Sequence, residues 1–342
     1  MNRKKRGEIE DYFLIGIFVI AVIIIIAVFY FLKPGEESVC GDGMSYDKCS
    51  SVKPYFCEKG LLIEKASVCG CYENSRINGE LCISDYQDGQ KNITLKYVLD
   101  GQEHYMNFSV YQKMAEYISN LPKDIFGDGE NSPSRTDFKL RNINEEKQRQ
   151  LLLPLVVKIQ NSAKSKEDQM RIAVSLVQNI HFGESEKKVN FFGQEVNYSR
   201  YPYEVLYDMN GVCGEKSELL AFLLKEIGYS TAIFYFHDEN HEAVGIKCPV
   251  EKSYKESGYC FVETSGPAII NDGGLKYIGG VRLMSFPEIM IISEGDSLNK
   301  NLYEYDDAEK MNKIRERGVN VLNVNAFDYL KRKYGLTGEY NV

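Results

Sequence analysis

The feature that most constrains this chain is an uninterrupted apolar segment near its amino terminus. Tyr12–Leu32 is 21 residues long and carries no charged side chain, enough for a helix to cross the hydrocarbon core of a bilayer. It has no polar face, so it does not suit a helix packed on a water-soluble core. A cleaved signal peptide is the alternative, but the apolar run is too long and no A-x-A-like site follows. The segment is therefore predicted to be a transmembrane helix.

Basic residues predict the orientation of this anchor. Four consecutive basic residues, 3–6, precede the apolar segment, whereas Lys33 is the only basic residue close behind it. Positively charged flanks stay in the cytoplasm. We therefore expect a cytoplasmic stub over 1–11, a membrane helix over 12–32, and an extracytoplasmic region over 33–342 of a single-pass cell-membrane protein.

The cysteines are consistent with an oxidising compartment. The chain has nine, and a dense cluster of six lies within residues 33–91. Such a cluster in an exported protein is typical of a disulfide-stapled module, although the sequence does not choose among the possible pairings. Zinc binding is the alternative, but the spacings contain no C-x-x-C pair. The clustered cysteines are Cys40, Cys49, Cys57, Cys69, Cys71 and Cys82.

The three remaining cysteines are spread through the second half of the chain. Cys248 and Cys260 flank an expected hairpin and are candidates for a further disulfide. If these two cysteines pair, Cys213 is left without a disulfide partner. An unpaired cysteine in an exported protein is a candidate reactive thiol.

Beyond the cysteine-rich module the pattern predicts an α+β fold, because helices precede a set of antiparallel strands. Residues 92–165 are expected to form a hairpin and helical region, with the hairpin turn at Asp100-Gly101. Residues 166–342 are expected to form the main domain with a carboxyl-terminal extension. Loops are expected at 126–137 and 183–204, strands at 230–236, 243–248, 259–264, 276–283 and 288–293, and late helices at 305–317 and 325–334.

Cys213 lies at the start of an expected helix. The sequence "NGVCGEKSELLAFLLKEIG" has leucines at helical spacing and ends at Gly228, a typical helix stop. Free N–H groups at a helix start stabilise a thiolate and can hold an oxyanion. Gly211 and Gly214 remove bulk beside the sulfur, so a substrate backbone is expected to approach closely. The pattern favours a nucleophile; a buried structural thiol and a disulfide with Cys248 or Cys260 are the alternatives.

A thiolate nucleophile needs a base, and the base needs an orienting partner. His241 opens a strand-like run, "HEAVGIKC", and Glu263 lies in the next one, "YCFVETS". If the two strands pair antiparallel, the two side chains lie side by side. The segment "HDENH", from His237 to His241, is close to the zinc motif H-E-x-x-H. That motif needs a helix, whereas the segments on both sides of "HDENH" are predicted to be strands.

The order of these pieces resembles the transglutaminase-like superfamily of papain-type Cys-His-Asp enzymes. The similar segments are "RIAVSLVQNIHF", "YPYEVLYDMNGVCGEKSELLAFLLKEIGYSTAIFYF", "NHEAVGI" and "YCFVETS", about a third of the chain. The resemblance implies a nucleophile helix packed on an antiparallel sheet, with Cys213 as nucleophile, His241 as general base and acid, and Glu263 as the orienting carboxylate. The chain departs from the family in having glutamate where aspartate is usual and Glu242, not an aromatic residue, after the histidine.

These observations predict a membrane-anchored, extracytoplasmic thiol enzyme that acts on amide bonds of a protein or peptide. We expect hydrolysis, as in a cysteine peptidase or amidase, because water is always available as an acceptor. The alternatives are acyl transfer by a cross-linking enzyme and a non-catalytic surface protein that keeps the fold. No cofactor and no metal are expected. The net charge of −8 and the lack of a basic stripe argue against nucleic acid as a partner.

Overall fold

The computed structural model describes residues 21–22, 39–121, 133–186, 188–191, 194–274, 276–277 and 280–337. The predicted stub and transmembrane helix lie outside these residues, apart from positions 21 and 22. Among the residues described, none of the helices has both the length and the apolar character needed to cross a membrane.

The cysteine-rich segment folds as two small hairpins held by disulfides. β1 (Tyr55–Glu58) pairs with β2 (Leu61–Glu64), β3 (Ser75–Asn78) pairs with β4 (Leu81–Ser84), and the short helix α2 (Ala66–Cys69) lies between the hairpins. So small a segment buries little apolar surface, and covalent links compensate for this. The disulfides are Cys40–Cys57, Cys49–Cys69 and Cys71–Cys82.

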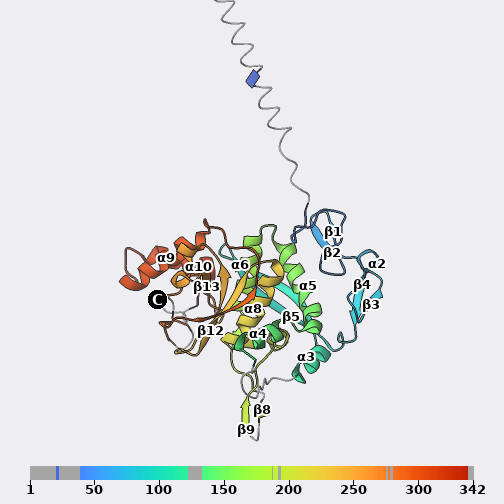
Figure 1. Cartoon of the computed structure of the whole chain (residues 1–342). Coiled ribbons are helices and arrows are strands. Elements are labelled where there is room, and N and C mark those ends of the chain that lie inside the picture. Colours follow the sequence, from blue (N-terminus) through green and yellow to red (C-terminus); the bar gives the residue numbers. More distant parts are fainter. Residues whose placement is uncertain are drawn as a thin grey trace, which may run out of the picture.

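A long hairpin follows, as the sequence predicted. β5 (Gln90–Leu99) pairs in register with β6 (Gln102–Tyr111). Asp100 and Gly101 form the turn with φ values of 51° and 76°, the positive values that a tight two-residue hairpin turn needs. The chain then forms α3 (Gln112–Ser119). Figure 1 shows β5 beside the helical centre of the molecule.

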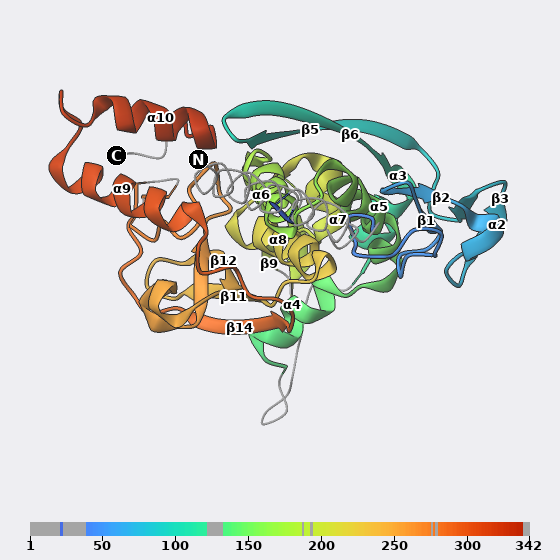
Figure 2. The same ribbon diagram turned by 90° about the horizontal axis from the view of Figure 1, so that it is seen from above.

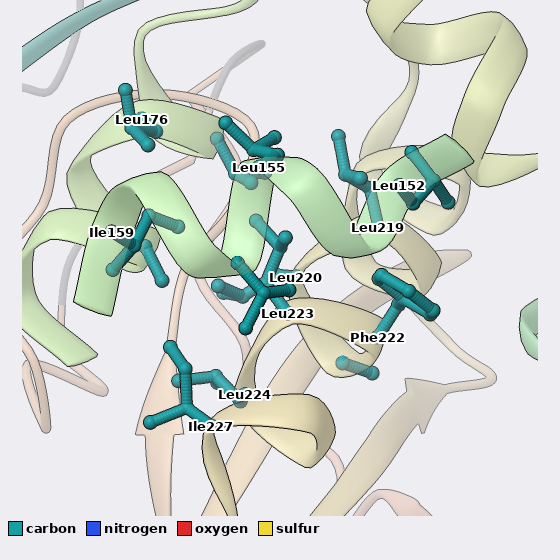
Figure 3. Packing of buried hydrophobic residues seen from close by; sticks show 14 of the residues in the cluster. Leu152, Leu155, Ile159, Leu176, Leu219, Leu220, Phe222, Leu223, Leu224 and Ile227 are labelled. Carbon is teal, nitrogen blue, oxygen red and sulfur yellow. The ribbon is translucent and has the colours of Figure 1, made fainter. Parts of the chain in front are cut away.

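Three helices form that centre. α5 (Glu146–Ser162) and α6 (Lys166–Gln178) both pack against α8 (Cys213–Ile227). Figure 3 shows Leu152 and Leu155 of α5 beside the leucines of α8, and all of these side chains are buried. Each buried leucine contributes about 1.5–3 kcal/mol. This packing fixes α8, and with it the residue in its first turn.

α8 also packs on one face of a four-stranded antiparallel sheet with the strand order β13-β12-β11-β14. Phe234, Phe236 and Phe261 form a second apolar cluster. The disulfide expected between Cys248 and Cys260 is present and joins the ends of two neighbouring strands. The strands are β11 (Thr231–Phe236), β12 (His241–Lys247), β13 (Tyr259–Val262) and β14 (Glu288–Ser293). Together with the helices they make the α+β fold that the sequence predicted.

A helix begins inside the loop expected at 126–137. α4 (Arg135–Ile143) starts where the backbone N–H of Asp137 donates to Ser134 Oγ (3.2 Å) and the backbone N–H of Ser134 donates to the Asp137 carboxylate (2.8 Å). This reciprocal pair is a capping box, which stabilises a helix start. The expected loop was therefore wrong from residue 135 onward.

The segment expected as a loop at 183–204 also contains strands and the start of a helix, whereas the described residues of 276–283 form no strand where one was expected. Among the residues described there, an isolated bridge pairs Lys276 with Arg282. The additional elements are β7 (His181–Phe182), β8 (Lys188–Phe191), β9 (Gln194–Asn197), α7 (Pro202–Asp208), β10 (Asn210–Gly211), η1 (Val250–Lys252) and η2 (Tyr254–Glu256).

The chain ends with two helices, α9 (Tyr303–Arg317) and α10 (Val324–Tyr334). Arg171 of α6 reaches Glu304 of α9, and Lys333 of α10 lies 2.6 Å from the Asp307 carboxylate of α9. These ion pairs join the helices to each other and to the centre. Figure 2 shows α9 and α10 at one end of the molecule and the cysteine-rich hairpins at the other.

Candidate active site

Cys213 is the first residue of α8, and a buried ion pair fixes this helix start. The Glu215 carboxylate accepts hydrogen bonds from the backbone N–H groups of Val212 (3.0 Å) and Arg200 (2.7 Å). The Arg200 guanidinium lies 3.0 Å from the same carboxylate. All nine cysteines lie in the described residues, and Cys213 alone is unpaired. Cys213 is half-buried and lies at the start of a helix that these contacts hold in place.

His241 is the first residue of β12, where the hairpin register pairs it with Phe236 of β11. Its side chain is 1 % exposed, and Nε2 lies 2.9 Å from Glu263 Oε2. Burial lowers the pKa of His241, but the Glu263 charge and hydrogen bonds with Glu263 and Cys213 outweigh burial and raise it to about 10. Since Nε2 faces Glu263, Nδ1 is the ring nitrogen left for the thiol. The neighbouring Glu263 carboxylate thus favours the protonated form of the His241 ring.

Glu263 directly follows β13, and the pairing of Val244 with Val262 brings its side chain to His241. Its other oxygen, Oε1, accepts from the backbone N–H of Thr264 (2.9 Å) and from the N–H (2.8 Å) and Oγ (2.7 Å) of Ser265. Burial raises the pKa of Glu263, but His241 and these donors lower it overall. The structure therefore brings Cys213, His241 and Glu263 together in the predicted order.

Tyr277 is a site residue that the sequence did not reveal. Its ring stacks on His241 with 3.9 Å between centroids and 21° between planes. The Tyr277 hydroxyl donates to the backbone carbonyl of Glu239 (3.0 Å), in the turn that leads to His241. An aromatic ring at this place shields the His241–Glu263 bond from water. Tyr277 lies in the segment expected to be a strand, and no motif marks it.

Cys213 lines a cleft with a volume of about 420 Å³. One wall comes from α4 and β11, where the Arg135 guanidinium lies 3.7 Å from the centroid of the Tyr235 ring. Tyr198 and Ser199 also line the cleft.

Glu242 follows His241 in β12, and its carboxylate lies against Gly214, the residue after Cys213. Its carboxylate lies 2.7 Å from Lys139 Nζ and 3.8 Å from an Arg135 nitrogen, both on α4. A Cβ at Gly214 would lie 2.5 Å from Glu242 Oε2. Gly214 therefore leaves space for the Glu242 carboxylate, whereas the sequence analysis expected it to leave space for a substrate. α4 was not expected, so Arg135 and Lys139 were missed.

Lys139 is a bridge between two carboxylates. Its Nζ lies 2.8 Å from Glu218 of α8 and 2.7 Å from Glu242 of β12. Burial lowers the pKa of Lys139, but the two carboxylates outweigh burial and raise it. Lys139 therefore stays charged and ties the nucleophile helix to the histidine strand.

The zinc motif does not form. His237 lies in the turn between β11 and β12, where no helix exists, and its Nε2 lies 3.2 Å from Glu288. His241 faces Glu263. Throughout the described ranges, no cluster of three or more His, Cys, Asp or Glu side chains is arranged to hold a metal ion.

No family model and no curated protein matches this chain. Among solved structures the chain is similar to LapG of Legionella pneumophila. The calcium-bound form is 14 % identical over 50 % of this chain and 98 % of that one, with a TM-score of 0.27. The EGTA-treated form is 15 % identical over 52 % and 96 %, with a TM-score of 0.26. The likeness is distant, and the site described above is defined by contacts within this chain.

Proposed function

We propose that this chain is an extracytoplasmic, membrane-anchored thiol hydrolase that cleaves amide bonds in proteins or peptides. The observation that carries the proposal is the unpaired Cys213 thiol at a helix start, electrostatically coupled to a buried His241 whose ring Glu263 holds. A nucleophile, a base and an orienting acid in contact are the components of acyl transfer.

The reaction follows from the positions of these groups. The Cys213 thiolate attacks the substrate carbonyl carbon, and the oxyanion that forms faces the first-turn N–H groups of α8, which lack intrahelical acceptors. His241 donates its proton to the departing amine as the C–N bond breaks, leaving a thioester. His241 then takes a proton from water, whose oxygen attacks the thioester and releases the acid and the thiolate.

The proposed location rests on two features. Four disulfides are stable in an oxidising compartment outside the cytoplasm. The apolar segment 12–32 precedes the disulfide-linked region by only a few residues, which keeps the catalytic region close to the membrane. A protein or peptide at the cell surface is therefore the proposed substrate.

The proposal is tested by alkylating the full chain with iodoacetamide between about pH 5 and 9. Wild type is expected to react well below the range of an ordinary thiol, and His241→Ala is expected to lose this acidic reactivity. His237→Ala is the matched control, because His237 is exposed and bound to Glu288 instead.

Two outcomes would contradict the proposal. One is a Cys213 that resists alkylation in the native protein; the other is reactivity that His241→Ala leaves unchanged. Incubation of a reactive wild type with casein and a fluorescent amine then separates the alternatives, since hydrolysis releases peptides and acyl transfer labels the protein.

A further inference from the structure

Lys216 is the most completely buried cation near the site, and the chemistry above does not use it. It lies one turn after Cys213 on α8 and is 0 % exposed. Its ammonium donates to the backbone carbonyls of Ile180 (2.7 Å), Ser265 (3.0 Å) and Gln178 (3.4 Å). A buried ammonium is costly, and a cation retained in such a place next to an active centre is a functional candidate.

These three carbonyls join Lys216 to the residues that hold the acid. Ser265 donates two hydrogen bonds to Glu263 Oε1, and its carbonyl accepts from Lys216. Gln178 also reaches this turn, because its side-chain amide donates to the Glu263 backbone carbonyl (2.9 Å). Lys216 thus links the end of α6, the turn after β13 and the nucleophile helix.

The charges of the site show why a cation belongs there. The active form holds a thiolate, an imidazolium and a carboxylate, whose charges sum to −1. His241 and Glu263 are 1 % and 0 % exposed, so water screens this charge poorly. One ammonium brings the sum to zero.

The titration of Lys216 agrees with this coupling. Burial lowers its pKa to about 7, while the negative charges of Glu263 and Cys213 raise it against burial. Such coupling is reciprocal, so a protonated Lys216 favours the anionic forms of both groups.

We infer that Lys216 is a positioning residue that serves as the buried counter-ion of the Cys213–His241–Glu263 array and stabilises its charged, reactive form. It touches no substrate and acts through the array. The inference rests on the proposed function, because it requires the thiolate–imidazolium pair.

The test compares alkylation profiles of the full chain for wild type, Lys216→Met and Lys216→Gln. Methionine keeps the length without charge or donors, and glutamine keeps an N–H donor without the charge. Lys225→Met is the matched control, because Lys225 lies in the last turn of the same helix and contacts Asn144 instead. Circular dichroism and thermal unfolding identify the variants that fold.

We expect the acidic limb of Cys213 alkylation to move to higher pH by about one unit in both Lys216 variants, a rate loss of about tenfold on that limb. Lys225→Met is expected to follow wild type. Profiles of folded Lys216 variants that superimpose on wild type would overturn the inference, since a purely structural role changes stability without moving the profile. If only Lys216→Gln folds, the alkylation profile of that variant decides the question. If neither variant folds, the inference is also overturned, because Lys216 is then required for folding.

The same experiment keeps the two proposals apart. If wild-type Cys213 shows no His241-dependent reactivity, the proposed function fails. If wild type is reactive and the Lys216 variants match it, only the counter-ion role fails.

Discussion

His241 Nε2 lies 2.9 Å from Glu263 Oε2, and the strands that carry these residues are tied near their other ends by Cys248–Cys260. His241 begins β12 and Glu263 follows β13, so antiparallel pairing places both residues at the same end of the two strands. The disulfide holds the two strands together near their other end. The position of the base relative to its partner thus depends on a covalent link distant from the thiol.

Glu263→Gln is predicted to remove the charge that holds the imidazolium while keeping the side-chain volume. Without the carboxylate, His241 loses its proton more readily and the thiolate loses its partner. We expect the rate of Cys213 alkylation near pH 6 to fall at least about tenfold. Glu288→Gln, which alters the partner of exposed His237, is the control and should react as wild type does. An unchanged profile in Glu263→Gln would refute this role.

The pH dependence of stability should reveal the bound proton on His241. Its pKa is raised from 6.5 to about 10 in the folded state, so its contribution is complete below about pH 6.5 and is lost as pH rises toward 10. Lys216, with its pKa lowered to about 7, acts in the opposite direction, so wild type alone does not isolate the effect.

Urea unfolding of wild type and His241→Gln at several pH values separates the two contributions. The stability that the variant lacks is expected to be largest near pH 6 and to shrink as pH approaches 10. A difference that grows with pH would contradict the raised pKa.

Removal of the Cys248–Cys260 disulfide by a double change to alanine is predicted to lower the free energy of unfolding by about 2–4 kcal/mol. It should also reduce Cys213 alkylation at acidic pH, because the His241–Glu263 pairing loosens. Removal of Cys71–Cys82, which closes a loop of similar length (sequence separations of 12 and 11), is the control. It should leave the alkylation profile as in wild type, and equal effects of the two changes would count against the proposed link.

Gly214→Ala is predicted to destabilise the protein by about 1–3 kcal/mol, because the new methyl group overlaps the Glu242 carboxylate. The cost should be smaller in a Glu242→Ala background, where the space is vacant. Chemical unfolding of both single variants and the double variant measures this coupling. Additive effects would show that the overlap is relieved in another way.

The sequence predicted the parts of the site that have a local signal. Helical leucine spacing and a stop at Gly228 predicted α8, and strand-like runs at 230–236 and 243–248 predicted β11 and β12. The odd number of cysteines indicated that one of them, Cys213, has no disulfide partner. The resemblance to transglutaminase-like enzymes then assigned His241 and Glu263 to the same centre, where the structure places them.

The parts that were missed depend on contacts between distant segments. Lys139 reaches Glu218 and Glu242, about 80 and 100 residues further along the chain, and no local pattern encodes such a pair. Tyr277 stacks on His241 from a segment whose described residues form only an isolated bridge. One local signal was present in the sequence: the spacing of Ser134 and Asp137 is typical of a helix start and predicts α4, although not its place beside the cleft.

The contact between Gly214 and Glu242 also has an evolutionary consequence. A side chain at position 214 fits without overlap only where the side chain at position 242 is shorter or has turned away, and a change at 242 leaves Lys139 paired with Glu218 alone. Positions 139, 214 and 242 are therefore expected to constrain one another. Among descendants of a common ancestor, they should vary together or not at all.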